Sequence, residues 1–356
     1  MGKIKEAVLT IYFLARLPFI LALRLLFKPR ARPPEKVRKI LVVRLDRMGD
    51  FILSLPVIDN LRAAYPEARI DVLVRPYLKE LALLVKAIDN MVTFDGLLST
   101  IRKIRREKYD IAMDMLYDYK IRSALLTFFT GAPIRIGFKG GYRELLFTGS
   151  VERALEAKED MISTNLKLLE KLDVEPRVEV PRLVVESVEG AAKATIAIHP
   201  GAYYESQKWG WEKFAAVGKK IIGSYGVTLL VIGGPDDKDT VNRIIQKIDD
   251  RSARAVFPSA GELASLLSAC RLLACNNSGP LHLAAALGVP TVSIMGPTDP
   301  VLWHPKGKDN IVIRKDLPCS PCGRAKCSRH DCMELITVGE VMVAIDSLMT
   351  KKKEGA

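Results

Sequence analysis

The stretch that decides the fold is Asn276-Asn-Ser-Gly-Pro-Leu-His-Leu-Ala-Ala-Ala-Leu-Gly-Val-Pro290, which directly follows the apolar run Arg271–Cys275. An apolar run ending in small polar residues, then Gly-Pro and an Ala/Leu-rich run that stops at Gly288, predicts a strand, a tight turn and a helix. The first N–H groups of such a helix have no partner inside it, and the helix dipole is positive there. The turn therefore predicts a phosphate-binding site, although an ordinary capped helix after a buried strand gives the same pattern.

On both sides of this stretch, short β-branched runs alternate with helical patterns, which is typical of a parallel sheet covered by helices on both faces. The expected strands are 40–44, 70–74, 110–115, 195–199, 227–232, 271–275 and 291–295. The expected helices are 51–64, 77–88 and 120–130, with others after Trp211, Asp236, Gly261 and Pro280. The sequence thus predicts two Rossmann-like domains, which bind ligands beyond the carboxyl ends of their strands.

The predicted domain boundaries follow from this alternation. Residues 1–38 form an N-terminal extension, 39–175 and 194–336 form the two Rossmann-like domains, 176–193 form a polar linker, and 337–356 form a C-terminal helix with a basic tail. Two such domains facing each other would place the loops after their strands across one cleft.

Positive charge is concentrated at the N-terminus. The 356 residues carry a formal net charge of +13, of which residues 1–39 contribute +8 through ten Lys/Arg and two Glu. The remainder is only mildly basic, so nucleic acid is not an expected partner. The hydrophobic content of 49% and charged content of 27% are those of a globular protein.

Residues 7–27 are apolar except for Thr10, Arg16 and Arg24, and no small-residue cleavage site follows them. On a helical wheel, the polar residues among the first 28 fall within an arc of about 160°, and the opposite arc is apolar. This pattern favours a helix lying in the membrane interface, with its arginines reaching anionic headgroups. A membrane span and an amphipathic core helix are the alternatives, and either membrane mode leaves the domains on the cytoplasmic side.

Asp50 lies where the first expected helix begins, shortly after the strand at 40–44. Asp is a favoured N-terminal helix cap, and residue type alone favours that interpretation. The functional alternative is a carboxylate that accepts the proton of an acceptor hydroxyl.

Two loops in the second half carry further polar residues. The loop that begins His199-Pro-Gly-Ala202 continues to Lys208, which either holds a diphosphate or is a solvated surface lysine. The loop Gly233-Gly-Pro-Asp-Asp237 permits close backbone approach and supplies acids for ribose hydroxyls. The sequence lacks the GxGxxG spacing, which argues against a hydride-transfer enzyme.

Four cysteines follow in the pattern Cys319-x2-Cys322-x4-Cys327-x4-Cys332. This density is compatible with a structural zinc ion, although the spacing is not that of a standard zinc ribbon. Reduced, packed thiols are the alternative interpretation, since a cytoplasmic location disfavours disulfides.

Together these segments resemble glycosyltransferase family 9, the ADP-heptose:lipopolysaccharide heptosyltransferases. The resemblance extends from Lys39 to about Ile345, and its strength lies in the joint order of its motifs. The motifs are Arg44–Pro56, Thr130–Gly137, His199–Ala202, Asn276–Pro300 and Cys319–Cys332, the last being similar to the heptosyltransferase II branch.

The resemblance implies a GT-B fold with the acceptor on the N-terminal domain, the ADP-sugar on the C-terminal domain, inversion at the anomeric carbon and no required cofactor. Asp50 matches the catalytic carboxylate of the family. The implied donor-binding residues are Lys208, Asp237, Asn277, Ser278, Gly279, Pro280, Leu281 and His282. Candidates for binding acceptor phosphate or Kdo carboxylate are Arg122, Arg135 and Arg143.

The sequence departs from the family pattern at four donor-side positions. Gln207 stands where Lys is usual and Gly210 where Pro is usual, while Asp237 replaces a Glu and Asn277 an Asp. These departures keep open a second hypothesis, a non-catalytic, membrane-tethered protein that binds a sugar nucleotide or glycan.

The favoured prediction is an inverting glycosyltransferase on the cytoplasmic side of the inner membrane, held there peripherally or anchored through residues 1–38. It would transfer heptose from ADP-heptose to the lipopolysaccharide inner core, a lipid A precursor or a related glycolipid. A sugar-nucleotide 2-epimerase of similar architecture is the alternative enzyme. It would need no second substrate, and Asp50 next to the acceptor-binding arginines speaks against it.

Overall fold

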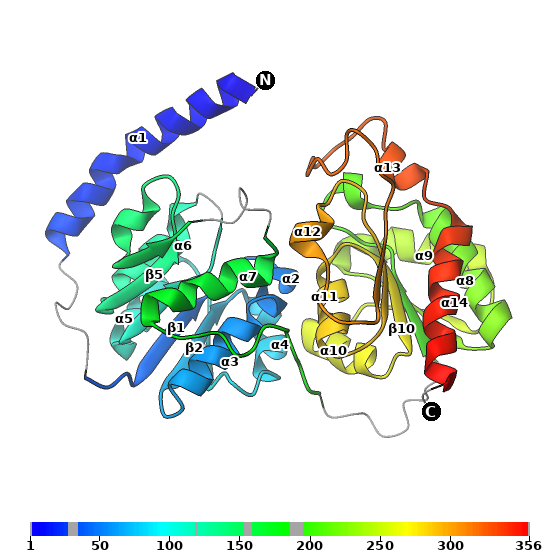
Figure 1. Cartoon of the computed structure of the whole chain (residues 1–356), viewed down its shortest axis with the longest axis horizontal. Coiled ribbons are helices and arrows are strands. Elements are labelled where there is room, and N and C mark those ends of the chain that lie inside the picture. Colours follow the sequence, from blue (N-terminus) through cyan, green and yellow to red (C-terminus); the bar gives the residue numbers. More distant parts are fainter. Residues whose placement is uncertain (1, 28–34, 118–119, 153–158, 186–194, 355–356) are drawn as a thin grey trace. The chain divides into compact units, whose positions relative to one another are not determined.

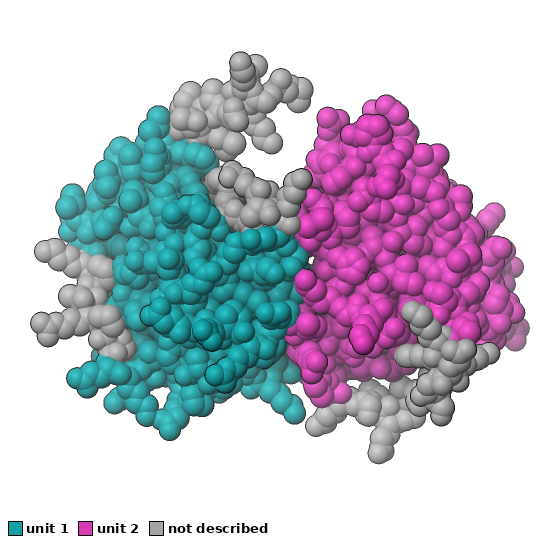
Figure 2. All heavy atoms as spheres, viewed as in Figure 1, with its two compact units in different colours: residues 1–179 teal, residues 180–356 magenta. Residues whose placement is uncertain are grey.

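The computed structural model describes residues 2–27, 35–117, 120–152, 159–185 and 195–354, with side chains from Tyr12 to Thr350. The chain divides into two compact units, residues 1–179 and residues 180–356, coloured separately in Figure 2. Residues 28–34 of the basic N-terminal run, residues 186–193 of the predicted linker and the end of the basic tail lie outside these described residues.

Unit 1 is built on a six-stranded parallel sheet with the strand order β3-β2-β1-β4-β5-β6 (Figure 1). Its strands are β1 (Lys39–Val43), β2 (Arg69–Val74), β3 (Asn90–Thr93), β4 (Ile111–Asp114), β5 (Ile134–Phe138) and β6 (Gly149–Val151). The central strands β1 and β4 are paired in parallel, and Ile40 of β1 lies opposite Ile111 of β4. Helices cover both faces of these strands, which explains their almost continuous apolar sequences.

Unit 2 repeats this arrangement, with the strand order β12-β11-β10-β7-β8-β9. Its strands are β7 (Thr195–His199), β8 (Thr228–Ile232), β9 (Ala253–Val256), β10 (Leu272–Asn276), β11 (Thr291–Ile294) and β12 (Asn310–Ile313). In both sheets the first and fourth strands lie side by side at the centre, which is the Rossmann order. The chain changes direction across the sheet at this point, and sheets of this order generally bind ligands at the carboxyl ends of the two central strands, here β1 and β4, or β7 and β10.

The helices of unit 1 fix the first of these positions. They are α1 (Gly2–Leu26), α2 (Met48–Ile52), α3 (Leu55–Ala64), α4 (Lys79–Leu83), α5 (Leu97–Glu107), α6 (Ile121–Phe129) and α7 (Met161–Leu166), with 3-10 turns η1 (Pro76–Leu78), η2 (Arg143–Leu146) and η3 (Lys167–Leu172). Ile104 of α5 and Leu126 of α6 are buried in one core with Leu41 and Val43 of β1. The central strand that carries the candidate site is therefore held by packing along its length.

Unit 2 has helices on both sides of its sheet (Figure 1). They are α8 (Trp211–Tyr225), α9 (Lys238–Ile248), α10 (Ala260–Ser268), α11 (Gly279–Ala286), α12 (Pro300–Trp303), α13 (Asp331–Glu334) and α14 (Val338–Glu354), with 3-10 turns η4 (Glu205–Gln207) and η5 (Pro235–Asp237). Phe214, Ile244 and Ile345 bring α8, α9 and α14 into one core with β7, β8 and β10, while α10 and α11 lie on the other face.

Each predicted strand is present within one residue of its predicted ends, and β3, β5, β6, β9 and β12 were not predicted. The edge strands β3, β6, β9 and β12 have partly exposed positions, so their sequences lack a clear apolar pattern. The single helix predicted at 51–64 is two helices, α2 and α3. The break falls at Ser54, because Pro56 lacks the N–H that would continue the hydrogen-bond ladder.

The N-terminal helix α1 differs from prediction in the direction of Arg16. This side chain was expected to reach lipid headgroups, but its Nε donates a hydrogen bond to Gly141 O at 2.8 Å. Ile20 and Leu23 lie one and two turns later on the same side of the helix and are buried against α6 and η2. The side of α1 that carries Arg16 therefore faces the rest of unit 1. No helix in the described part of the chain combines the length and the apolar character needed to cross a membrane.

Candidate active site

Asp50 lies at the carboxyl end of β1, within the short helix α2, and its side chain is 14% exposed. Its Oδ2 accepts a hydrogen bond from Arg47 N–H at 3.4 Å, which closes the first turn of α2. Arg47 is the N-cap residue, so Asp50 is not the cap that residue type favoured but the third helical residue, which bonds back to the cap. The other carboxylate oxygen, Oδ1, lies 3.9 Å from Nη2 of the Arg44 guanidinium.

Arg44 places a buried positive charge beneath two carboxylates. Its side chain is 1% exposed, and its Nε lies 3.3 Å from Asp46 Oδ1. The guanidinium also donates to Met115 O at the end of β4 and lies 5.2 Å from the ring centroid of Tyr117. Burial lowers the pKa of Arg44, but Asp46, Tyr117 and Asp50 outweigh this and raise it, so the cation is permanent. Sequence reasoning included Arg44 in a motif but assigned it no role.

The second position is the N-terminus of α11, directly after β10. Ser278 is the N-cap residue with extended backbone, and its side chain makes no capping hydrogen bond to the first turn. Instead, Ser278 Oγ donates to Asn276 O at 3.2 Å and lies 3.4 Å from His199 Nδ1. In the first turn, Pro280 has no N–H and Leu281 N–H donates to Ser278 O at 3.2 Å. Because the cap side chain is turned away, the Gly279 N–H is the first-turn donor that neither the helix nor its cap uses, and it could serve an anion.

Two polar atoms beside this helix start are buried without a hydrogen-bond partner among the described residues. They are Asn277 Oδ1 and His282 Nδ1. Burial lowers the pKa of His282 to about 4, so its ring is neutral at physiological pH. A buried polar atom without a partner costs free energy unless something binds it, so this place fits a ligand that brings hydroxyl or N–H groups.

His199, at the end of β7, connects two of the predicted donor residues. It contacts Ser278, as described above, and interacts electrostatically with Asp237. Burial lowers the pKa of His199 and Asp237 opposes this shift. Asp237 Oδ2 accepts Gly234 N–H at 3.0 Å. A Cβ at Gly201 would lie 2.5 Å from Asp237 Oδ2 and 2.8 Å from His199 Cε1, so only glycine fits between them.

Asn276, the last residue of β10, fixes the loop after β7. Its Oδ1 accepts Trp209 N–H at 3.1 Å, and its Nδ2 donates to Pro200 O at 2.7 Å. Both Asn276 and Trp209 are fully buried. The carboxyl ends of β7 and β10 therefore form one rigid group of loops, which the sequence predicted only as separate segments.

Residues 97–333 match the family model described as glycosyltransferase family 9 (heptosyltransferase). The chain belongs to glycosyltransferase family 9. This membership confirms the predicted family and makes the chain a glycosyltransferase.

Curated relatives and solved structures agree with this family. Lipopolysaccharide heptosyltransferase 3 of Escherichia coli is 25% identical over 342 residues, covering 86% of this chain and 98% of that protein. Lipopolysaccharide heptosyltransferase 2 of E. coli K12 is 28% identical over 308 residues, covering 78% and 88%. The structure of E. coli ADP-heptose lps heptosyltransferase II has a TM-score of 0.76 at 23% identity, covering 88% of this chain and 99% of that one. This likeness confirms the predicted α/β fold class of two Rossmann-like sheets.

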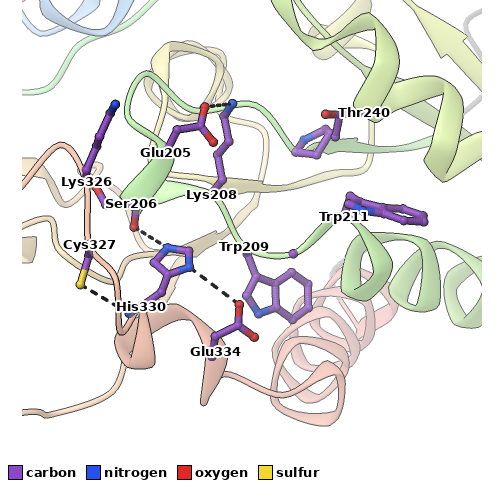
Figure 3. Close-up of a pocket in the computed structure, with 12 residues that line it drawn as sticks. Glu205, Ser206, Lys208, Trp209, Trp211, Thr240, Lys326, Cys327, His330 and Glu334 are labelled. Atoms are coloured by element: carbon purple, nitrogen blue, oxygen red, sulfur yellow. Dashed lines mark hydrogen bonds and ion pairs between the residues drawn. The ribbon is translucent and has the colours of Figure 1, made fainter.

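In this family 9 member, Lys208 lies in a pocket of about 530 Å³ in unit 2 (Figure 3). Its Nζ pairs with Glu205 Oε1 at 2.6 Å, so the predicted diphosphate contact would require Lys208 to leave that carboxylate. The neighbouring Gln207, at the usual Lys position, donates to Thr298 Oγ1 at 3.0 Å. The pocket lining includes Lys208 and Trp209 but none of residues 277–282.

The three predicted acceptor arginines differ in accessibility. Arg122 is exposed, 5.0 Å from the ring centroid of Phe94. Arg143 is fully buried, where it pairs with Asp114 and donates to Leu116 O at 3.0 Å. Arg135 is 5% exposed and donates to Leu146 O at 3.0 Å. Burial, with the nearby Arg24, lowers the pKa of Arg135 to about 10. The prediction that Arg135 and Arg143 bind acceptor disagrees with this placement, because their guanidinium groups are buried and bond to oxygen atoms inside unit 1.

The four cysteines of the predicted zinc cluster are free thiols. Cys319, Cys322 and Cys327 are exposed and Cys332 is buried. Across the described residues, no three Cys, His, Asp or Glu side chains are placed to hold a metal ion. Hydrogen bonds from the main chain of His330 and Arg329 lower the pKa of Cys327, while burial raises that of Cys332. The thiols as arranged therefore do not fit the predicted zinc site, and no step of the reaction is assigned to it.

Proposed function

We propose that this chain is an inverting glycosyltransferase that transfers a heptose from ADP-heptose to the lipopolysaccharide inner core or a related glycolipid. One observation carries the proposal. A carboxylate suited to proton removal, Asp50, follows the central strand β1 of unit 1, and a helix start suited to a diphosphate follows the central strand β10 of unit 2. The names of the E. coli relatives, which are lipopolysaccharide heptosyltransferases, support the choice of substrates.

Unit 2 would bind the donor. The main-chain N–H of Gly279 at the start of α11 would donate to the diphosphate, and the helix dipole adds positive potential. Asn277 Oδ1 and neutral His282 Nδ1 accept hydrogen bonds from the hydroxyl or amino groups of the sugar nucleotide. Asp237, held by Gly234 N–H beside Gly201, accepts from ribose hydroxyls.

Unit 1 would supply the base. As the acceptor oxygen attacks the anomeric carbon, its proton passes to the Asp50 carboxylate. The bond between the anomeric carbon and the diphosphate oxygen breaks at the same time, and ADP leaves with the electron pair. Attack opposite the leaving group inverts the anomeric carbon. The helix start stabilises the charge that grows on the diphosphate, and this stabilisation lowers the barrier.

The acceptor is an anionic glycolipid, which explains why basic side chains would assist its binding. Arg122 is the exposed arginine of the predicted set and is available to a phosphate or carboxylate of the acceptor. An acceptor of this kind supports a location at the cytoplasmic side of the inner membrane, where α1 would contact the lipid surface.

The test measures ADP release after ADP-heptose is mixed with a lipopolysaccharide-core acceptor. Asp50→Ala should abolish release, yet the ADP-induced rise in melting temperature should match wild type because the donor residues lie in unit 2. Turnover by Asp50→Ala at the wild-type rate would refute the proposed base. Wild-type protein that binds ADP-heptose without releasing ADP would favour the non-catalytic binder, and release without acceptor would favour other chemistry.

A further inference from the structure

Helix α1 packs on the rest of unit 1 through the side that carries Arg16, Ile20 and Leu23. Ile20 and Leu23 are buried against α6 and η2, and Arg16 bonds to Gly141 O. Gly141 has a positive φ of 60°, and a Cβ there would lie 2.1 Å from Arg16 Nη2. A larger residue would displace the Arg16 side chain, so glycine at this position favours the docked position of α1.

Beyond these contacts, the described surface of α1 is largely exposed and apolar. Between Tyr12 and Phe27 the strongly exposed large apolar side chains are Tyr12, Leu14, Phe19, Leu21, Leu25, Leu26 and Phe27, with exposed fractions of 39 to 79%. Within this described stretch, Arg24 is the one charged residue with an exposed side chain. Apolar exposure of this extent on a water-facing helix marks a surface that binds a partner.

A groove extends this apolar surface onto α5. It has a volume of about 610 Å³ and is lined by apolar side chains from three helices and by three arginines. The lining residues are Phe19, Phe27, Leu97, Leu98, Ile101, Leu125 and Phe129, with Arg102, Arg105 and Arg106. Leu98 lines this groove and is 70% exposed, so a large apolar side chain faces water there.

The three arginines have no carboxylate partner in the part of the chain that the structure describes. Arg102 and Arg106 are exposed, and Arg105 lies 5.9 Å from the ring centroid of Phe27. By contrast, Lys103 on the same helix pairs with the Asp95 carboxylate at 2.5 Å. An apolar floor with unpaired guanidinium groups at its edge matches an amphiphile with an anionic head.

We propose that the exposed side of α1 and the arginine edge of α5 together form a docking surface for an anionic lipid bilayer, with one acyl chain entering the groove and lipid phosphates contacting Arg102, Arg105 and Arg106. A second copy of the chain is a poorer occupant, because a two-fold contact would bring these arginines against one another. This surface adds α5 to the membrane contact proposed for α1, and it does not depend on which reaction the enzyme catalyses.

The experiment is co-sedimentation of the full chain with phosphatidylcholine vesicles that contain or lack phosphatidylglycerol. The wild type should bind the anionic vesicles more tightly. Arg102→Glu/Arg106→Glu should weaken this binding at least ~10-fold, since each basic residue near such a surface contributes roughly 1 kcal/mol. Lys219→Glu/Lys220→Glu on α8 changes the net charge equally and should bind like wild type, because these exposed lysines lie in unit 2.

A second pair of variants tests the apolar part. Leu98→Asp should weaken binding, whereas Leu83→Asp, which alters a leucine of α4 that is 64% exposed, should not. Wild-type vesicle binding by both Leu98→Asp and the double arginine variant would overturn the proposal. So would a wild-type dimer in light scattering that Leu98→Asp converts to a monomer, because a second copy would then occupy the surface.

Discussion

Arg44 donates two hydrogen bonds to the main-chain oxygen of Asp50, at 3.0 Å from Nε and 2.8 Å from Nη2. A third nitrogen of the same guanidinium donates to Met115 O. The end of β1, the start of α2 and the end of β4 are thus joined through one planar group. We infer that Arg44 is a positioning residue that sets where the Asp50 carboxylate stands.

Arg44→Lys should therefore lower kcat by roughly 10- to 100-fold, because a lysine ammonium keeps the charge but cannot reach both carbonyl groups. The KM for ADP-heptose should change little, since the donor residues lie in unit 2. Steady-state kinetics measure both values. Arg69→Lys is the matched control: Arg69 also pairs with a buried carboxylate of unit 1, Asp71, at 2.7 Å. The control should lose stability but keep kcat, and an equal loss of kcat in both variants would contradict the role of Arg44.

Asn277→Ala should weaken ADP-sugar binding by about 5-fold, the worth of one hydrogen bond to an uncharged partner. The unliganded protein should melt no lower than wild type, because the change removes a buried oxygen that has no partner among the described residues. Calorimetric titration and thermal melts test the two effects. Asn310→Ala should behave in the opposite way, since Asn310 bonds to Thr291 and Lys306 away from the donor residues. A lower melting temperature for Asn277→Ala would mean that its side chain is structural.

Gly201→Ala should reduce donor affinity by at least ~10-fold, because the new Cβ would displace Asp237 or His199 from where they stand. Gly223→Ala on α8 is the comparison, since a Cβ there meets nothing within 4 Å. That change should stabilise the protein by roughly 0.5–1 kcal/mol through helix propensity and leave binding intact. Donor titrations on both variants decide, and normal affinity in Gly201→Ala would refute the proposed site.

Acid should destabilise the protein through His282. Its folded pKa of about 4 lies below the ordinary value of 6.5, so the unfolded state binds the proton more tightly. The stabilisation is complete above pH 6.5 and is lost as the pH falls toward 4, reaching a loss of about 2 kcal/mol at pH 5. Urea unfolding at pH 7 and pH 5 measures this. The difference should shrink in His282→Gln, and an unchanged difference would assign the acid sensitivity to other groups.

The sequence predicted the central strands and the helix start at Ser278 because buried β-branched runs and a Gly-Pro turn are local signals. It did not predict the contacts that build the site. Asn276 binds the main chain near Trp209, and His199 meets Ser278, across more than sixty residues of sequence. Arg143 was a candidate for acceptor binding because the sequence does not reveal that Asp114 lies beside it in the core. The strand order decides such contacts, and it emerges only from the folded chain.

The repeated strand order has one more consequence. Each unit has its own six-stranded sheet and its own core, and the division falls between Glu179 and Val180. In the proposed function, proton removal belongs to one unit and sugar-nucleotide choice to the other. A chimera that joins residues 1–179 to the second half of another family member should therefore fold, and would exchange the donor while keeping the base.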